Sequence, residues 1–148
     1  MGLGNNTVAS GADLTRLNEG LTLVAIHDTR GFSIGYGHDG AKEGDVWTQD
    51  QADAAFDQDY PLACSRAEAD LGAAEYAALS PQRQAVLNDM AYEIGGAGLA
   101  QFKNMLAAIK VTDWPGAAAA LKTSELFSQV QTRENRNIQV LLTGDWPT

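Results

Sequence analysis

The period with which apolar residues recur changes once along this chain, and that change constrains the fold more than any other feature. Residues 21–37 alternate apolar and polar side chains in two short runs, and the segment between them, Asp28-Thr29-Arg30-Gly31, is typical of a tight turn. This stretch predicts a β-hairpin. From Gly44 onward the apolar residues recur about every 3.6 positions, which predicts helices. We therefore expect an α+β fold that is mostly α.

Capping residues and helix breakers set the expected helix limits. A short helix is predicted from about Asp13 to Asn18, and Gly20 breaks it. Thr48 and Gln51 have the spacing of a capping box, and this helix is expected to end near Pro61. Four later helices are predicted. The first starts at Ser80-Pro81 and stops at Gly95-Gly96, and the second runs from about Leu99 to Lys110. The third starts at Asp113-Trp114-Pro115, and the fourth starts at Thr132, with Gly144 just beyond its end.

The length and the apolar content indicate one domain. A chain of 148 residues with 45% apolar side chains can bury a sizeable core. We expect a single domain over residues 1–148. Residues 1–12 are expected to be flexible, residues 13–47 to form a lobe of one helix and the hairpin, and residues 48–148 to form a helical lobe.

Charge and cysteine content exclude several classes of function. The net charge is −9, and its acidic excess lies in residues 1–75, which argues against nucleic-acid binding or an anionic membrane surface. No apolar stretch approaches the roughly 18 residues of a membrane span, and the N-terminus lacks the pattern of a secretory signal. The one cysteine, Cys64, excludes an internal disulfide and a zinc-type cluster.

The hairpin region concentrates the side chains that could carry out catalysis: Glu19, His27, Asp28, Ser33 and His38. Two carboxyl groups on short rigid elements can act on opposite sides of a bond, one as general acid and one as base or nucleophile. The spacing by itself is also compatible with exposed acids around a turn.

Three blocks of sequence strengthen the catalytic interpretation. The first is Asn18-Glu19-Gly20-Leu21, then Asp28, then Ser33-Ile34-Gly35-Tyr36-Gly37-His38; the second runs from Asn88 to Gly95 and is followed by Phe102; the third is Leu126-Phe127-Ser128-Gln129, Arg133, Arg136 and Thr143-Gly144-Asp145-Trp146. Together they are collinear over residues 14–146, and they resemble the active-site signature and helical segments of the phage-type lysozymes, glycoside hydrolase family 24.

The resemblance implies a lysozyme-like fold with a cleft between a small hairpin lobe and a larger helical lobe. It also implies an inverting muramidase that cleaves the β-1,4 bond between N-acetylmuramic acid and N-acetylglucosamine in peptidoglycan and so lyses bacteria. Glu19 matches the family's general acid, while Asp28 and Ser33 match the carboxylate and the hydroxyl that direct the attacking water. Arg133 matches the arginine that pairs with the catalytic glutamate. No metal or organic cofactor is expected.

Other residues are expected to support substrate binding at the cleft: Gly35, His38, Glu93, Phe102, Asn104 and Gln129. His38 is expected mainly to end the hairpin and bond to a nearby carboxylate. Glu93 could line the cleft floor or lie on a solvated helix face, and Phe102 and Asn104 could face the cleft or form a simple helix junction.

The chain departs from the family pattern at the hairpin. Ser33 replaces a threonine, and four residues separate Asp28 from Ser33 where the family has five. Counting back from Ser33 would put His27 in place of Asp28, and a one-residue slip turns strand side chains to the opposite face. A second conflict concerns Arg133, because a cation there lowers the pKa of Glu19 whereas a general acid needs a raised pKa.

Two alternatives remain open, a peptidoglycan-binding virion module with weakened catalysis and a lytic transglycosylase. The expected partner is the glycan strand of peptidoglycan, with no nucleic acid, no stable membrane insertion and a monomeric state. We expect a soluble protein that is made in the bacterial cytoplasm and released to the periplasm and cell wall, or a domain of a virion protein.

Overall fold

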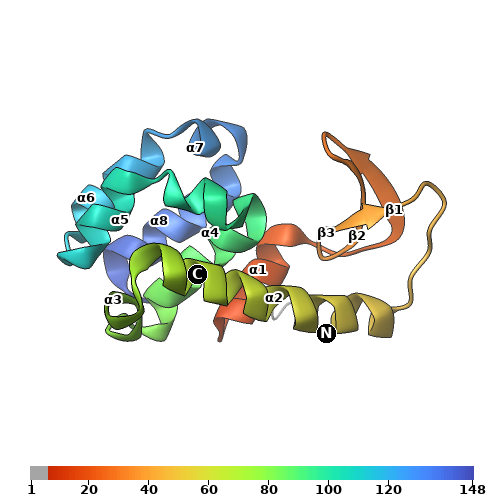
Figure 1. The fold of residues 1–148 in the computed structure, drawn as a ribbon, viewed down its shortest axis with the longest axis horizontal. Coiled ribbons are helices and arrows are strands. Elements are labelled where there is room, and N and C mark those ends of the chain that lie inside the picture. The colour runs from red at the N-terminus through yellow and green to blue at the C-terminus, as the bar shows by residue number, and fades with distance from the viewer. Residues whose placement is uncertain (1–6) are drawn as a thin grey trace.

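The computed structural model describes residues 7–148, which form one small sheet and a series of helices (Figure 1). The elements are α1 Gly11–Glu19, β1 Thr22–Asp28, β2 Gly31–Gly35, β3 His38–Ala41, α2 Gln49–Leu71, α3 Ala73–Ala77, α4 Pro81–Ala100, α5 Lys103–Lys110, α6 Trp114–Lys122, α7 Glu125–Gln129 and α8 Gln131–Thr143. The predicted α+β class, mostly α with the strands near the N-terminus, is confirmed. Within the described residues, no helix combines the length and the apolar character needed to cross a bilayer.

The sheet contains the predicted hairpin and one further strand. Strands β1, β2 and β3 pair antiparallel in sequence order, and Asp28 pairs with Gly31 across the two-residue turn between β1 and β2. The third strand, β3, was not predicted. Its sequence, His38-Asp39-Gly40-Ala41, is short and has no apolar alternation, so its extended shape comes from pairing with β2 and not from its own pattern.

The sheet packs on the N-terminal half of α2 and stands apart from the α4–α8 group in Figure 1. Ile34 is fully buried in this contact, and the Tyr36 ring meets the Phe56 ring edge to face at 5.4 Å. His38 Nδ1 lies 2.6 Å from Asp59 Oδ2, so the expected bond between His38 and a carboxylate is confirmed. The small lobe is therefore held through α2.

The helical lobe has one continuous apolar core. Its fully buried side chains come from the C-terminal half of α2 and from α4, α5, α6 and α8, and the largest are Leu71, Leu87, Met90, Leu99, Met105, Ile109, Leu121 and Leu141. Helix α1, which carries the catalytic candidate Glu19, packs against α4 of this lobe.

The prediction that a helix ends near Pro61 was wrong. The capping box of Thr48 and Gln51 is present as predicted, but α2 continues through Pro61 to Leu71. A proline inside a helix costs about 3 kcal/mol, because it removes a hydrogen bond and crowds the preceding turn. Phe56 before Pro61 and Ala63 after it are both buried, so packing on the two lobes outweighs that cost.

Two predicted boundaries around α4 and α5 need correction. Gly95 breaks the regular helix as expected, with φ of 76°, but helical turns resume and α4 ends at Ala100. Leu99 therefore belongs to the end of α4, where it is fully buried, and α5 begins only at Lys103. The left-handed break at Gly95 redirects the last turn of α4 toward the core, which the helical period of the sequence does not reveal.

The start of α8 also differs from the prediction. The helix is capped at Val130 rather than at Thr132, and no side chain makes the capping hydrogen bond. The buried side chains of Arg133 and Glu134 hold this first turn in place instead. The predicted starts of α4 at Ser80 and α6 at Asp113, and the end of α8 at Gly144, are confirmed.

The flexible segment expected over residues 1–12 falls partly on residues 1–6, which lie outside the described part of the chain. The rest of it differs from the expectation. Val8 is buried beside Leu14 and Ala85, and Trp146 packs against the same cluster. Ser10 caps α1 by accepting a hydrogen bond from the backbone N–H of Asp13 at 3.1 Å, so α1 begins earlier than predicted.

Candidate active site

Glu19 lies at the C-terminal end of α1, where three helices meet. The Arg133 side chain of α8 reaches this point and donates from Nη1 to Glu19 Oε2 at 2.7 Å. The same guanidinium holds Asp89 of α4 in a bidentate pair, with Nε to Oδ2 at 3.0 Å and Nη2 to Oδ1 at 2.9 Å. The structure thus brings Arg133 and Glu19 together, as the sequence resemblance implied.

Asp89 is the fully buried anchor of this junction. Its carboxylate also accepts hydrogen bonds from Thr15 Oγ1 at 2.8 Å, from Asn18 Nδ2 at 3.1 Å and from Asn137 Nδ2 at 2.9 Å. These donors come from α1 and α8, so one carboxylate ties three helices together around Glu19. Sequence reasoning placed Asp89 inside a motif but assigned it no role; an acid in the middle of an otherwise buried helix was the available signal.

The pKa of Glu19 is raised in spite of the adjacent guanidinium. Burial is the largest cause, since it penalises the charged carboxylate, while the charge and hydrogen bond of Arg133 lower the pKa and the charge of Asp89 raises it. Because Asp89 takes two of the hydrogen bonds of Arg133 and balances its charge, burial prevails at Glu19. A carboxyl group of this kind suits a proton donor.

A glycine of the sheet lets the Glu19 carboxyl group lie close to the backbone. Gly37 has a φ of 74°, and a Cβ at this position would collide with Glu19 Oε1. The Tyr92 hydroxyl of α4 donates to the carbonyl of Tyr36 at 2.5 Å and so fixes this turn to the helical lobe. Glu19 is therefore enclosed between Arg133 and the turn that follows β2.

Asp28 and Ser33 share one face of the sheet. Ser33 pairs with Ile26 across the strands, and Asp28 lies two residues further along β1 on the same side. A hydrogen bond from the Arg30 backbone N–H, at 2.8 Å, is the largest cause that lowers the pKa of Asp28, and the Ser33 side chain lowers it further. Asp28 is therefore held ionised at the end of β1, beside a hydroxyl group.

His27 lies on the opposite face of β1. It pairs with Phe32, and the two rings meet edge to face with their centroids 5.1 Å apart. The two-residue turn keeps Asp28 on the side of Ser33 even though the connection is shorter than the family pattern. This register favours Asp28 over His27 as the second carboxylate position.

Two predicted supporting residues, Gly35 and His38, lie against another part of the small lobe. A Cβ on Gly35 would be 3.0 Å from the Trp47 ring, and Gly35 has a φ of 70°. The His38 ring also packs beside Trp47, with centroids 5.4 Å apart, and bonds to Asp59. Both residues hold the sheet to α2, which is a structural contribution.

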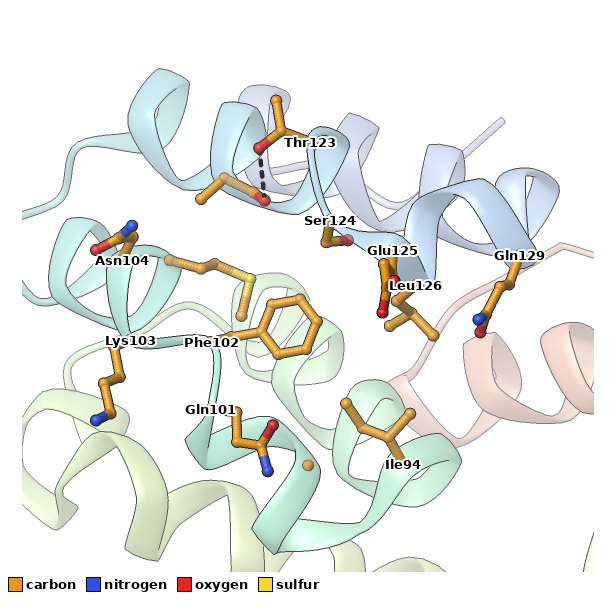
Figure 2. A pocket seen from close by; sticks show the side chains of 13 residues that line it. Ile94, Gln101, Phe102, Lys103, Asn104, Thr123, Ser124, Glu125, Leu126 and Gln129 are labelled. Carbon is orange, nitrogen blue, oxygen red and sulfur yellow. Dashed lines mark hydrogen bonds between the residues drawn. The ribbon is translucent and has the colours of Figure 1, made fainter. Parts of the chain in front are cut away.

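Two adjoining hollows extend from the Arg133 junction along the helical lobe. The outer one, of about 500 Å³, is lined by Phe102, Asn104 and Gln129, and in Figure 2 the Phe102 ring projects into it between α5 and α7. The inner one, of about 480 Å³, is lined by Glu93, Gln129 and Arg133. Gln129 borders both, so five of the predicted residues line a connected surface that leads to Arg133, the partner of Glu19.

Sequence reasoning missed a second acid beside Glu93. Glu134 of α8 is fully buried and accepts a hydrogen bond from Asn137 Nδ2 at 2.9 Å, and Glu93 affects its pKa directly. Glu93 Oε1 lies 3.4 Å from Arg133 Nε. We call Glu19, Asp89, Glu93, Arg133 and Glu134 the Arg133 network. Its acids are separated in sequence, and only the packing of α1, α4 and α8 joins them.

Comparison with known proteins places this chain in a family. The chain is 28% identical over 95% of its length to the pre-baseplate central spike protein Gp5 of Enterobacteria phage T4, of which it covers only 29%. It is 26% identical to the probable T4-type lysozymes 2 and 1 of Dictyostelium discoideum, over 93% of this chain and 96% of each relative. The sequence profile of the family described as phage lysozyme matches residues 16–137, which include Glu19, Asp28, Ser33 and Arg133. The chain belongs to the phage lysozyme family.

Proposed function

We propose that this protein is an inverting muramidase that hydrolyses the β-1,4 bond between N-acetylmuramic acid and N-acetylglucosamine in peptidoglycan. The observation that carries the proposal is the opposite effect of the site on its two acids: the pKa of Glu19 is raised by burial, and that of Asp28 is lowered by hydrogen bonds. Two carboxyl groups whose environments separate their pKa values in this way are suited to the roles of acid and base.

In the proposed reaction, Glu19 donates its proton to the oxygen of the leaving sugar. Asp28, ionised and on the same face of the sheet as Ser33, orients a water molecule and accepts a proton from it as the water attacks the anomeric carbon from the opposite face. Arg133 holds the Glu19 carboxyl group through Oε2. The hollows lined by Phe102, Asn104, Gln129 and Glu93 are proposed to contact the glycan strand and its peptides.

Turnover of purified peptidoglycan tests these roles. We expect Glu19→Gln and Asp28→Asn each to reduce the rate by about 10²-fold or more, since each removes a proton-transfer group. The matched control is His27→Gln, which changes the neighbouring residue on the other face of β1 and should keep most of the activity. Full activity in Asp28→Asn together with loss in His27→Gln would reverse the assignment of the second catalytic position.

The products distinguish hydrolysis from a lytic transglycosylase reaction. Hydrolysis leaves a reducing N-acetylmuramic acid end, whereas a transglycosylase leaves a 1,6-anhydro sugar. The contact of Asp28 with Ser33 supports hydrolysis, because water needs a base that the transglycosylase reaction does not. Mass spectrometry of the digest should show reducing ends, and a predominance of anhydro ends would contradict the proposal.

A second candidate function is that of a wall-binding lysozyme domain in a virion protein. The similarity to a phage spike protein, over 95% of this chain but 29% of that relative, favours this setting. Sedimentation with purified cell wall separates the two functions. If the wild type and Glu19→Gln bind wall equally and are equally inactive, the binding function is supported; if only the wild type releases soluble sugar, the chain is an active muramidase. We propose that in either setting it acts as a monomer on glycan strands at the bacterial wall.

A further inference from the structure

The Arg133 network contains two acids, Glu93 and Glu134, that the proposed reaction does not use. Glu134 is fully buried, and the Glu93 side chain is only 13% exposed. The two carboxyl groups act on each other directly. Ionised carboxylates are acceptors only and repel each other, so two of them side by side in a buried place are favourable only if one carries a proton.

Asn137 Nδ2 donates to Glu134 Oε1 at 2.9 Å, but two other oxygens of the pair have no donor among the described residues. Glu93 Oε1 and Glu134 Oε2 are both buried and receive no hydrogen bond from any donor of the described residues. The nearest cationic donor, Arg133 Nε, points to Asp89 Oδ2 at 3.0 Å and lies 3.4 Å from Glu93 Oε1. A buried acceptor without a donor is unfavourable, so a proton between the two acids is favoured.

The balance of charge around the pair leads to the same result. Titratable and charged groups from three helices face the Glu93–Glu134 pair: Glu19 from α1, Asp89 and Tyr92 from α4, and Arg133 and Arg136 from α8. Arg30, in the β1–β2 turn, acts on Glu19 at longer range. Arg136 is directed to Asn18 Oδ1 at 2.8 Å. The network itself thus sets four carboxyl groups against the single guanidinium of Arg133, an excess that protons must reduce.

Resting on the muramidase function proposed above, we propose that Glu93 and Glu134 share one proton and act as a positioning pair: the single negative charge that they retain offsets Arg133, so that Glu19 keeps its proton at the pH of catalysis. Asp89 fixes Arg133 by hydrogen bonds, and the pair supplies the further charge balance. Burial, the largest cause, raises the pKa of Glu93 to about 9, in agreement with a proton retained at neutral pH.

The shared proton can be measured on the folded protein without reference to catalysis. In protein with ¹³C-labelled glutamate carboxyl groups, the resonances of Glu93 and Glu134 are assigned from Glu93→Gln and Glu134→Gln and followed between pH 4 and pH 10. We expect one proton of the pair to be released only above pH 7. If both carboxyl groups titrate below about pH 6, near ordinary glutamate values, the inference is overturned whatever the activity of the protein.

The positioning role is tested by the pH profile of kcat/KM. The double variant Glu93→Gln/Glu134→Gln removes the negative charge, so Arg133 acts more strongly on Glu19. We expect the alkaline limb, where Glu19 loses its proton, to move to lower pH by about half a unit or more. Glu93→Gln alone retains the charge on Glu134, because the new amide donates in place of the shared proton, and should leave the limb unchanged.

Glu68→Gln, an exposed acid on α2, is the control for a general loss of charge and should also leave the limb in place. An alkaline limb that is the same in the double variant and the wild type overturns the positioning role. If the double variant does not fold, the titration of the wild type decides whether a proton is shared. If the wild type does not cleave peptidoglycan, the muramidase proposal fails while the titration still tests the pair.

Discussion

At the scale of single residues, the site separates two acids by their contacts. Glu19 is enclosed by Arg133 and Gly37, whereas Asp28 is partly exposed and takes a backbone N–H from Arg30. The pKa of Glu19 is raised because burial outweighs the cation, and that of Asp28 is lowered because its charged form is hydrogen-bonded with little burial. The two proposed roles therefore rest on local packing and not on any difference in the chemistry of the side chains.

Gly37→Ala tests how closely Glu19 must approach the sheet. The added Cβ collides with Glu19 Oε1, so we expect the carboxyl group to move and activity on peptidoglycan to fall by about 10²-fold or more. Gly40→Ala is the matched control, because Gly40 also has a positive φ, of 90°, but its Cβ would meet no atom within 4 Å. Both variants should lose about 1–2 kcal/mol of stability from the left-handed backbone. Equal activity in the two variants would show that the approach of Glu19 to Gly37 is unimportant.

At the scale of secondary structure, α2 connects the two lobes. Its N-terminal half packs under the sheet through Phe56, and its C-terminal half packs in the helical core through Ala63, Ala67 and Leu71. Pro61 lies between the halves. A helix that passes through both lobes couples the position of Asp28, on the sheet, to that of Glu19, which is held by the helical lobe.

Replacing Pro61 with alanine restores a backbone N–H in the middle of α2 and removes the clash of the ring. We expect Pro61→Ala to raise the free energy of unfolding by about 1–3 kcal/mol, measured by urea denaturation. Pro81→Ala is the control, because Pro81 occupies the first turn of α4, where proline is favoured, and its replacement should be neutral or slightly destabilising. A loss of stability in Pro61→Ala would mean that the proline is needed to shape the connection between the lobes.

At the scale of the whole molecule, the acidic excess has two locations. Most of it lies on the surface of the first half, for example on α2, where Asp50 and Asp57 are exposed. A smaller part, the Arg133 network, lies in the interior between α1, α4 and α8, where the charge of each acid depends on burial. The formal net charge of −9 counts every acid as ionised, so it counts more negative charge in the Arg133 network than the buried acids carry at neutral pH.

The buried acids make the stability of the protein fall as pH rises. The pKa of Glu93 is raised from 4.5 to about 9, and those of Glu19 and Glu134 are also raised. Between those values the folded state binds more protons than the unfolded state, so the free energy of unfolding decreases with pH. We expect the Tm to fall from pH 5 to pH 8, and the slope to be smaller in Glu93→Gln/Glu134→Gln. Equal slopes in the two proteins would contradict the raised pKa of Glu93.

The sequence by itself predicted the α+β class, the hairpin, the helix starts at Thr48, Ser80 and Asp113, and the catalytic candidates that the family resemblance implies. These depend on local chemistry: the alternation of residues 21–37, the capping groups of Thr48, Ser80 and Asp113, and a run of motif residues around Glu19. The limits of α2, of α4 and of the start of α8 were wrong or incomplete because burial outweighs a proline, redirects a turn at a glycine and replaces a missing cap.

Only the tertiary structure decided the surroundings of each acid. The register of β1 and β2 put Asp28 on the face of Ser33 and His27 on the other. The Asp89 carboxylate accepts two hydrogen bonds from Arg133 and offsets its charge, which explains how Glu19 can have a raised pKa beside a cation. Protonation depends on burial and on neighbours from distant helices, which spacing along the chain does not contain, whereas secondary structure depends largely on residues a few positions apart.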